Sequence, residues 1–292
     1  MTTTKEIKNQ IKSVNNIKQI TRAMELMSVA KMRRAAERVE DTREYATRAL
    51  EILKNVGQIP GLRDDLFRYP DTEKTLAVVL ASDQSLCGSF NANVRKQTTE
   101  FIGSETAVDI VAVGTQTARF SERLRAEVIR SFSDFNERVQ IADVAEMFAY
   151  LLDEFKAGNY RRVVVIYSHY ETALKYTPLV RQLLPVDPEN MGDMLDDSAA
   201  IRKEDMSSYL FEPSAESVLK ALLPRLSRIR LFQAMMESQA SEHAARMFAM
   251  KNATENAEEV ANELETDYNR ARQRQVTQEI AEISAGANAL NT

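Results

Sequence analysis

The side chains best suited to nucleophilic or metal chemistry are few and far apart in this sequence. It has one cysteine, Cys87, and two histidines, His169 and His243. A cysteine nucleophile needs a base that a third group holds in place, and neither histidine has a sequence context that suggests this role. One cysteine forms no internal disulfide, and two separated histidines form no metal-ligand cluster. We therefore expect no metal and no other cofactor, and interpret Cys87 as a buried or half-buried structural thiol.

A phosphate-binding loop would place closely spaced backbone N–H groups between a strand and a helix, through the pattern GxxxxGK[ST] or GxGxxG. Neither pattern occurs. The nearest candidate is SDQSLCGSFN, residues 82–91, whose single glycine is weak support, so a plain strand-to-helix turn is the favoured interpretation. The adjacent acids Glu258 and Glu259 lie in an acid-rich stretch and indicate solvated surface. Nothing in the sequence indicates catalysis.

Composition limits the class of protein. The 292 residues, 44% of them hydrophobic, are enough for one or two domains. The first 56 residues have more cations than acids, but acids interrupt the basic run and few aromatic residues interleave with it, so we expect no nucleic-acid partner. No run approaches the roughly 20 apolar residues of a membrane span, and the first residues lack the apolar core of a signal peptide. A cytoplasmic location is expected.

Glycine and proline divide the chain, because all seven prolines lie between Gly57 and Pro224. Thr2 to Val56 contains neither breaker, and neither does Arg225 to Ala285. In the first of these segments apolar residues recur at intervals of three and four, at Ile7, Ile11, Val14, Ile17, Ile20, Met24 and Met27. We predict one long helix at each end of the chain, the second with its start near Pro213 and a bend or restart at Pro224.

Helices this long are not stable on propensity alone, so each must bury its apolar stripe, and the economical partner is the other helix. The three–four spacing predicts a long antiparallel coiled coil of the two terminal helices. Between them, β-branched runs at 74–82, 107–114 and 161–168 alternate with helical stretches near 90–102, 115–126 and 140–157. This alternation predicts an inserted, Rossmann-like α/β domain with a largely parallel sheet.

The expected organisation is therefore a coiled-coil helix at 1–56, a central α/β domain and foot at 57–212, and a second coiled-coil helix at 213–292. Residues 185–212 are acidic and rich in turn formers, which indicates a long exposed connection with one strand ending near Tyr209.

The apolar residues near position 20–34 surround their helix. On a helical wheel Ile20, Met24 and Met27 face one side, whereas Leu26 faces nearly the opposite side. The uncharged carboxyl-terminal stretch ISAGANALNT has the same character; a frayed tail is the alternative, although frayed tails are usually polar. One partner helix covers only one side, so the remaining apolar surface must contact another protein.

Three stretches carry a family resemblance: TRAMELMSVAKMRRA (21–35), SEHAARMFAMKNATENA (241–257) and VTQEIAEISAGANA (276–289). They resemble the gamma subunit of rotary F-type ATP synthases, and the similarity covers nearly the whole chain. The sequence departs from the family pattern at four positions, with Arg22 in place of Lys, Leu26 in place of Met, and Ser85 and Ser89 in place of glycines.

The resemblance implies a non-catalytic central rotor stalk that couples c-ring rotation to sequential conformational changes in the catalytic beta subunits, in ATP synthesis and in reversible hydrolysis. Its coiled coil would penetrate the ring of alpha and beta subunits. Its α/β domain and foot would bind the epsilon subunit and the membrane c ring, with the delta subunit in the same complex. The protein would lie on the cytoplasmic face of the bacterial inner (plasma) membrane.

The resemblance also implies site residues. Those expected to contact the beta subunits are Met24, Arg246, Arg272, Gln273, Thr277 and Glu279. Met24 is expected to face Arg246 and the Gln273–Glu279 region, and Arg272 with Gln273 match the pair that binds a beta-subunit catch loop. Tyr209 falls where the family's foot meets the c ring.

Two other classes of protein stay open from the residues alone. A static coiled-coil adaptor would have the same periodicity as a rotor shaft. A nucleotide-dependent enzyme could be built on the middle domain.

Overall fold

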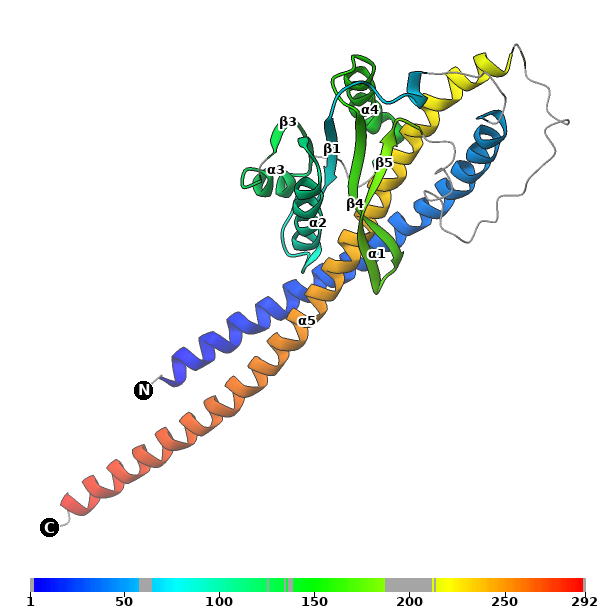
Figure 1. Cartoon of the computed structure of the whole chain (residues 1–292). Coiled ribbons are helices and arrows are strands. Elements are labelled where there is room, and N and C mark those ends of the chain that lie inside the picture. Colours follow the sequence, from blue (N-terminus) through cyan, green and yellow to red (C-terminus); the bar gives the residue numbers. More distant parts are fainter. Residues whose placement is uncertain are drawn as a thin grey trace. The chain divides into compact units, whose positions relative to one another are not determined.

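The computed structural model describes residues 3–57, 65–124, 126–133, 135, 139–186, 212 and 214–290. The backbone divides into two compact units (Figure 1). The helical unit comprises Met1–Ser28 with Arg246–Thr292, and the sheet unit comprises Val29–Ala245. Helices α1 (Thr4–Gly57) and α5 (Ala215–Leu290) contribute residues to both. The three-part division predicted at 56/57 and 212/213 stays a prediction.

The sheet unit contains a five-stranded mixed sheet in the order β3-β2-β1-β4-β5. Its strands are β1 (Lys74–Leu80), β2 (Ala107–Val113), β3 (Glu127–Phe132), β4 (Arg162–Thr172) and β5 (Lys175–Leu184). The first four are parallel to their neighbours, and only β5 pairs antiparallel, with β4. The largely parallel sheet and its three central strands are confirmed, because β1, β2 and β4 coincide with the β-branched runs.

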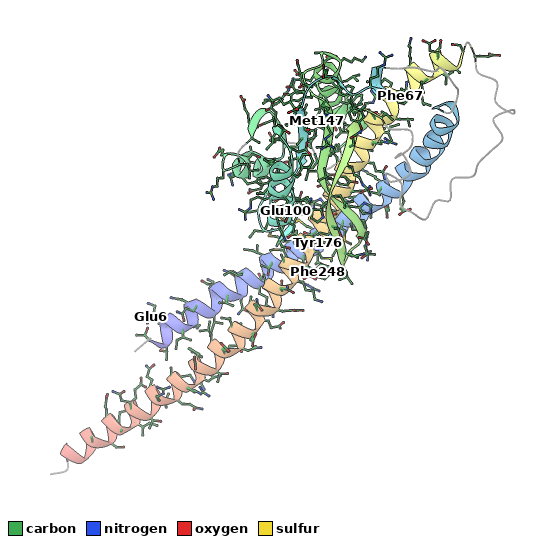
Figure 2. The ribbon with its side chains drawn as sticks, viewed as in Figure 1. Glu6, Phe67, Glu100, Met147, Tyr176 and Phe248 are labelled. Atoms are coloured by element: carbon green, nitrogen blue, oxygen red, sulfur yellow. The ribbon has the colours of Figure 1, made fainter. Side chains whose placement is uncertain are left out.

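Helices cover both faces of the sheet because its central strands are apolar on both sides. One face packs against α2 (Phe90–Ser104) and α3 (Thr115–Ser121). The other packs against α4 (Ile141–Lys156), around Met147, and against the amino-terminal part of α5 (Figure 2). A short 3-10 helix, η1 (Asp65–Phe67), adds Leu66 to this second core. The three helical stretches predicted between the strands are confirmed.

The amino-terminal part of α5 corrects one expectation. The helix runs through Pro224 without a restart, and its apolar residues there, including Leu223, Leu226 and Phe232, belong to the core on the sheet. The predicted coiled coil pairs this helix with the first one, whereas here the sheet covers Leu226 and Phe232, in a core that Val39 of α1 also joins. The sheet offers a wide apolar face, so it buries large side chains on several sides of the helix at once.

No helix in the described part of the chain carries an apolar run long enough to cross a bilayer.

Candidate functional site

In the helical unit, side-chain hydrogen bonds and an ion pair join α1 to α5. Thr4 Oγ1 donates to Gln275 Oε1 at 3.0 Å, and Lys18 Nζ pairs with Glu258 Oε1 at 2.7 Å. Thr254 Oγ1 donates to Thr21 Oγ1 at 2.8 Å. Residue numbers on α5 fall as those on α1 rise, so within this unit the two helices are antiparallel.

The least exposed positions of the helical unit recur at intervals of three and four on both helices. We call them the seam. On α1 the buried or half-buried seam positions are Ile7, Ile11, Val14, Lys18, Thr21, Glu25 and Ser28. On α5 they are Met250, Thr254, Ala257, Ala261, Leu264, Tyr268 and Ala271. From position 18 onward the α1 side of the seam is polar, and on α5 it contains small residues, so this contact has little of the bulk of an ordinary apolar core.

Large apolar side chains of α1 lie outside the seam. Ile17, Ile20, Leu26 and Met27 are all more than half exposed, and Ile20 reaches 60%. The seam contains the first three members of the predicted stripe, Ile7, Ile11 and Val14. The expectation that its later members Ile17, Ile20 and Met27 also pack against the second helix is wrong. We also predicted that apolar residues surround this part of α1 and that the second helix leaves some of them uncovered. The exposed fractions are consistent with that prediction.

The last described turns of α5 are exposed on every side, from Arg272 to Ala285. Val276, Ile280 and Ile283 follow one another at intervals of four and three, which places them on one face of the helix, and Ile283 is 72% exposed. Hydrogen bonds within the helix, such as Gln275 Nε2 to Glu279 Oε1 at 3.0 Å, add little stability. A helix with an exposed apolar stripe gains most of its stability from packing, so this stretch needs a partner. We call Ile17, Ile20, Leu26, Met27, Val276, Ile280 and Ile283 the outer apolar surface.

Charges of both signs line a groove of about 910 Å³ between α1 and α5 in the helical unit. Its lining includes Lys18, Arg22 and Lys251 together with Glu25 and Glu258. A hydrogen bond from Lys18, together with its charge, lowers the pKa of the Glu258 carboxyl group. Both side chains of the Lys18–Glu258 pair are partly exposed to solvent. The pair therefore adds little to the free energy of folding and mainly favours one alignment of α1 against α5.

The candidate phosphate turn in the sheet unit is closed by its own side chains. Asn91 Nδ2 donates to Ser82 Oγ at 2.7 Å and to Cys87 Sγ at 3.1 Å. Cys87 is buried, as expected of a structural thiol. Asp83 Oδ1 accepts the backbone N–H of Thr115 at 2.9 Å, so an acid occupies the first turn of α3. This carboxylate would repel a phosphate group there.

The histidines do not complete a catalytic or metal constellation around this turn. His169 Nδ1 lies 2.6 Å from Glu237 Oε2 on α5, whereas Cys87 belongs to the core on the α2 and α3 side. Among the described residues, no group of three or more His, Cys, Asp and Glu side chains could hold a metal ion.

Comparison with known proteins identifies the family. A family model described as ATP synthase matches residues 3–290. The ATP synthase gamma chain of Roseiflexus castenholzii is 37% identical over 297 residues, which cover 99% of both chains. That of Chloroflexus aurantiacus is 37% identical over 306 residues, with 100% of both chains covered. The chain belongs to the ATP synthase gamma-chain family.

Solved structures share the gamma-chain fold at lower identity. A chain of the Euglena gracilis mitochondrial ATP synthase, in a structure of its OSCP, F1 and c-ring, is 18% identical and has a TM-score of 0.68. The alignment covers 98% of this chain and 94% of that one. A chain from the central stalk and c-ring of the Tetrahymena thermophila enzyme is 24% identical, with a TM-score of 0.58 over 80% of this chain and 99% of that one. These likenesses concern the fold.

The gamma-chain site residues expected from the sequence fall into two groups. Met24 is half-buried and Arg246 is 6% exposed. Arg272, Gln273, Thr277 and Glu279 are all exposed on the last turns of α5. The four residues of the exposed group are accessible to a partner, whereas Arg246 has little exposed surface.

The structure does not bring Met24 beside the Gln273–Glu279 region as expected. Gln275 contacts Thr4 at the beginning of α1, and Met24 lies about 30 Å further along that helix by the helical rise. The antiparallel direction explains the difference, because the last residues of α5 pair with the first residues of α1. Tyr209 lies outside the described residues.

The sequence reasoning missed the division between seam and outer apolar surface. Its signal was present: Thr21 and Ser28 continue the seven-residue spacing of Ile7 and Val14, whereas Ile17 and Ile20 do not. Hydrophobicity alone favoured Ile17 and Ile20 as seam residues. The polar seam residues Thr21 and Ser28 are recognisable only by their seven-residue spacing.

Proposed function

We propose that this gamma-chain family member is the central rotor stalk of an F-type proton-translocating ATP synthase. The observation that carries the proposal is the outer apolar surface, which lies outside the seam between α1 and α5. Covering such a surface stabilises an assembly by about 25 cal/mol for each Å² of apolar area removed from water. A collar of alpha and beta subunits would provide the cover.

The exposed end of α5 is unequal around its axis, which is what rotary coupling requires. Val276, Ile280 and Ile283 present apolar bulk on one face, while Arg274 and Gln278 lie on nearly the opposite face by the helical spacing. Rotation driven by the c ring would bring different parts of this surface to each beta subunit in turn. Contact free energies that differ among beta conformations shift their populations, and the coupling runs equally in synthesis and hydrolysis.

The stalk itself is non-catalytic in this proposal. Its beta-subunit contacts are Met24, Arg272, Gln273, Thr277 and Glu279, with Arg246 taking part only through its small exposed area. In this proposal α1 and α5 together form an antiparallel coiled coil. The sheet unit and the foot, including Tyr209, meet the epsilon subunit and the c ring, with delta in the same complex. The protein is then peripheral, on the cytoplasmic face of the bacterial plasma membrane.

Reconstitution tests this proposal. Adding the chain to purified alpha and beta subunits should yield a complex with strongly raised ATPase turnover. The variant Ile280→Asn with Ile283→Asn should weaken this stimulation because it removes the exposed apolar stripe, whereas Gln278→Asn, on an exposed polar position nearby, should not. Unchanged turnover on adding the wild-type chain would reject the rotor assignment.

A static adaptor would bind through the same surface, so binding alone does not separate it from a rotor. A Met24→Cys variant cross-linked to a beta subunit should stop turnover, and reduction of the cross-link should restore it. Full turnover in the cross-linked complex would favour the adaptor. Tight nucleotide binding to the isolated chain in equilibrium dialysis would instead favour an enzyme built on the sheet unit.

A further inference from the structure

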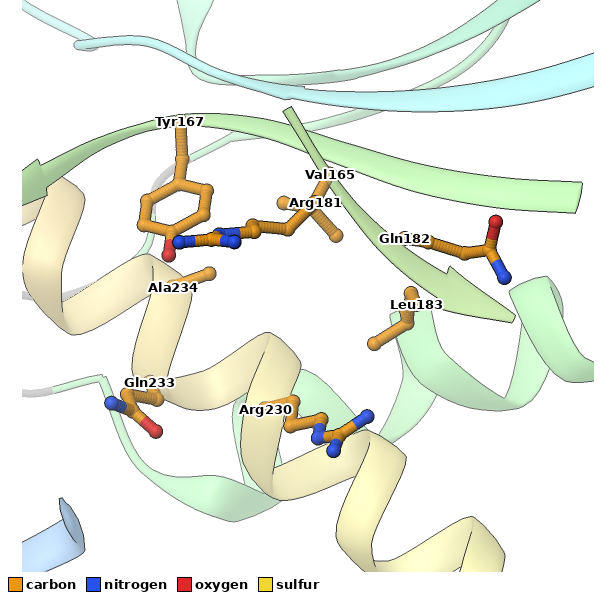
Figure 3. A pocket seen from close by; sticks show the side chains of 8 residues that line it. All are labelled: Val165, Tyr167, Arg181, Gln182, Leu183, Arg230, Gln233 and Ala234. Atoms are coloured by element: carbon orange, nitrogen blue, oxygen red, sulfur yellow. The ribbon is translucent and has the colours of Figure 1, made fainter. Parts of the chain in front are cut away.

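The sheet unit contains a small pocket that no step of the proposed rotor function uses. It has a volume of about 40 Å³ and lies between β4, β5 and α5. Figure 3 shows Tyr167 and Arg181 on its strand side and Arg230 and Gln233 on its helix side. A cavity holds one water molecule for each roughly 10–15 Å³ of such volume, so about three waters or one small ion would fill it. A nucleotide is too large.

Arg230 is the unusual member of this pocket. Part of its side chain reaches the surface, but Nε and Nη2 are buried and form no hydrogen bond. Burial lowers the pKa of this guanidinium group to about 10, so it remains a cation at neutral pH. No acid among the described residues acts on that pKa. A buried cation without hydrogen bonds is unfavourable unless a counter-ion accompanies it.

Glu237, whose carboxylate acts on Tyr167 of the pocket lining, already has other partners. Its Oε2 lies 2.6 Å from His169 Nδ1, and its Oε1 accepts a hydrogen bond from Gln233 at 3.0 Å. Burial and then the Glu237 carboxylate raise the pKa of the Tyr167 hydroxyl, which also lies beside the Arg181 guanidinium. Among the described residues, two guanidinium groups and one carboxylate leave this cluster with an excess of positive charge.

We propose that this pocket binds a small inorganic oxyanion of the phosphate class, held by the Arg230 guanidinium, while Arg181, whose guanidinium points toward the Tyr167 hydroxyl in Figure 3, adds positive charge to the same lining. A planar guanidinium group presents paired N–H donors that match two oxygens of such an anion, and buried Nε and Nη2 are one such pair. The bound anion would neutralise the excess charge and join β5 to α5. The proposal does not depend on the rotor assignment.

Thermal unfolding of the full-length chain tests the site, in a buffer without small oxyanions, with inorganic phosphate as the probe. Phosphate should raise the melting temperature in a saturable way, and calorimetric titration should give the same dissociation constant. Sulfate should act similarly, since it has the same shape. Either no saturable shift, or an equal shift with chloride at the same ionic strength, would overturn the proposal.

Substitution locates the binding. Arg230→Met should abolish the phosphate-dependent shift, whereas Arg225→Met, at an exposed position on the same helix, should retain it. Without phosphate, Arg230→Met should melt at or above the wild-type temperature because it removes an uncompensated buried charge. Should Arg230→Met fail to fold, Arg230→Lys keeps the charge without the paired donors and should bind phosphate about tenfold to a hundredfold more weakly. Unweakened binding in these variants would contradict the assignment.

Discussion

In the sheet unit, β1 buries Leu76 and Val78 completely between layers of helix. In the helical unit, the contact between α1 and α5 closes around Thr21 and Thr254, while Ile20 and its apolar neighbours face outward. The first arrangement is that of a domain that folds around its own core. The second arrangement leaves the outer apolar surface exposed, and an exposed apolar surface of this kind is typical of a binding site for another protein. One chain therefore combines a self-sufficient unit with a unit whose packing is completed by partners.

The largest contrast should appear when the same substitution is made in each unit. Leu151→Ala, in the core of the sheet unit at 0% exposure, should lower the free energy of unfolding by about 2–5 kcal/mol. Leu26→Ala, at an exposed position of the helical unit, should stay within about 0.5 kcal/mol. Urea unfolding of the isolated chain measures both. Similar losses at the two positions would break the comparison.

The polar seam predicts a smaller, non-additive effect. Thr254→Val or Thr21→Val alone removes this hydrogen bond, but the remaining hydroxyl group keeps a backbone acceptor, Met250 O for Thr254 and Lys18 O for Thr21, so each variant should cost about 0.5–1.5 kcal/mol. The double variant loses the shared hydrogen bond only once, so its loss should be smaller than the sum of the two single losses. A double-mutant cycle by urea unfolding measures the coupling. Strictly additive losses would show that the two side chains do not interact.

The smallest effect concerns the ion pair between Lys18 and Glu258. Lys18 lowers the pKa of Glu258 from its ordinary value of 4.5. A carboxyl group with a lowered pKa stabilises the folded state above its ordinary pKa, and this contribution is lost as the pH falls through the lowered value. Lys18→Met should therefore reduce stability slightly at pH 7 and by less as the pH falls below the ordinary pKa of the carboxyl group, with a smaller difference in high salt. A difference that grows on acidification would contradict the pairing.

The sequence predicted the elements whose residues are periodic and largely buried. Strands β1, β2 and β4 are continuous apolar runs, so they were recognisable without a structure. The edge strands β3 and β5 were missed. β3 is only half-buried along its length, and β5 contains Pro178, which is tolerated at the edge of a sheet but resembles a breaker in the sequence.

The candidate site was predictable only in outline. A helical wheel showed that apolar residues surround α1 near Met24, but it does not tell which side meets α5. That choice is made by contacts between residues distant in sequence, such as Thr21 with Thr254. The pocket at Arg230 gave no sequence signal, because Arg181 and Arg230 come together only when β5 and α5 pack.

Hydrogen exchange along α5 tests most directly whether the outer apolar surface is a binding surface. Backbone amides from Arg272 to Ala285 should exchange quickly in the isolated chain and at least about a hundredfold more slowly in a complex with alpha and beta subunits. Amides of β1 should be protected to the same degree in both samples, since the sheet unit has its own core. Fast exchange of the Arg272–Ala285 amides in the assembled complex would contradict the account.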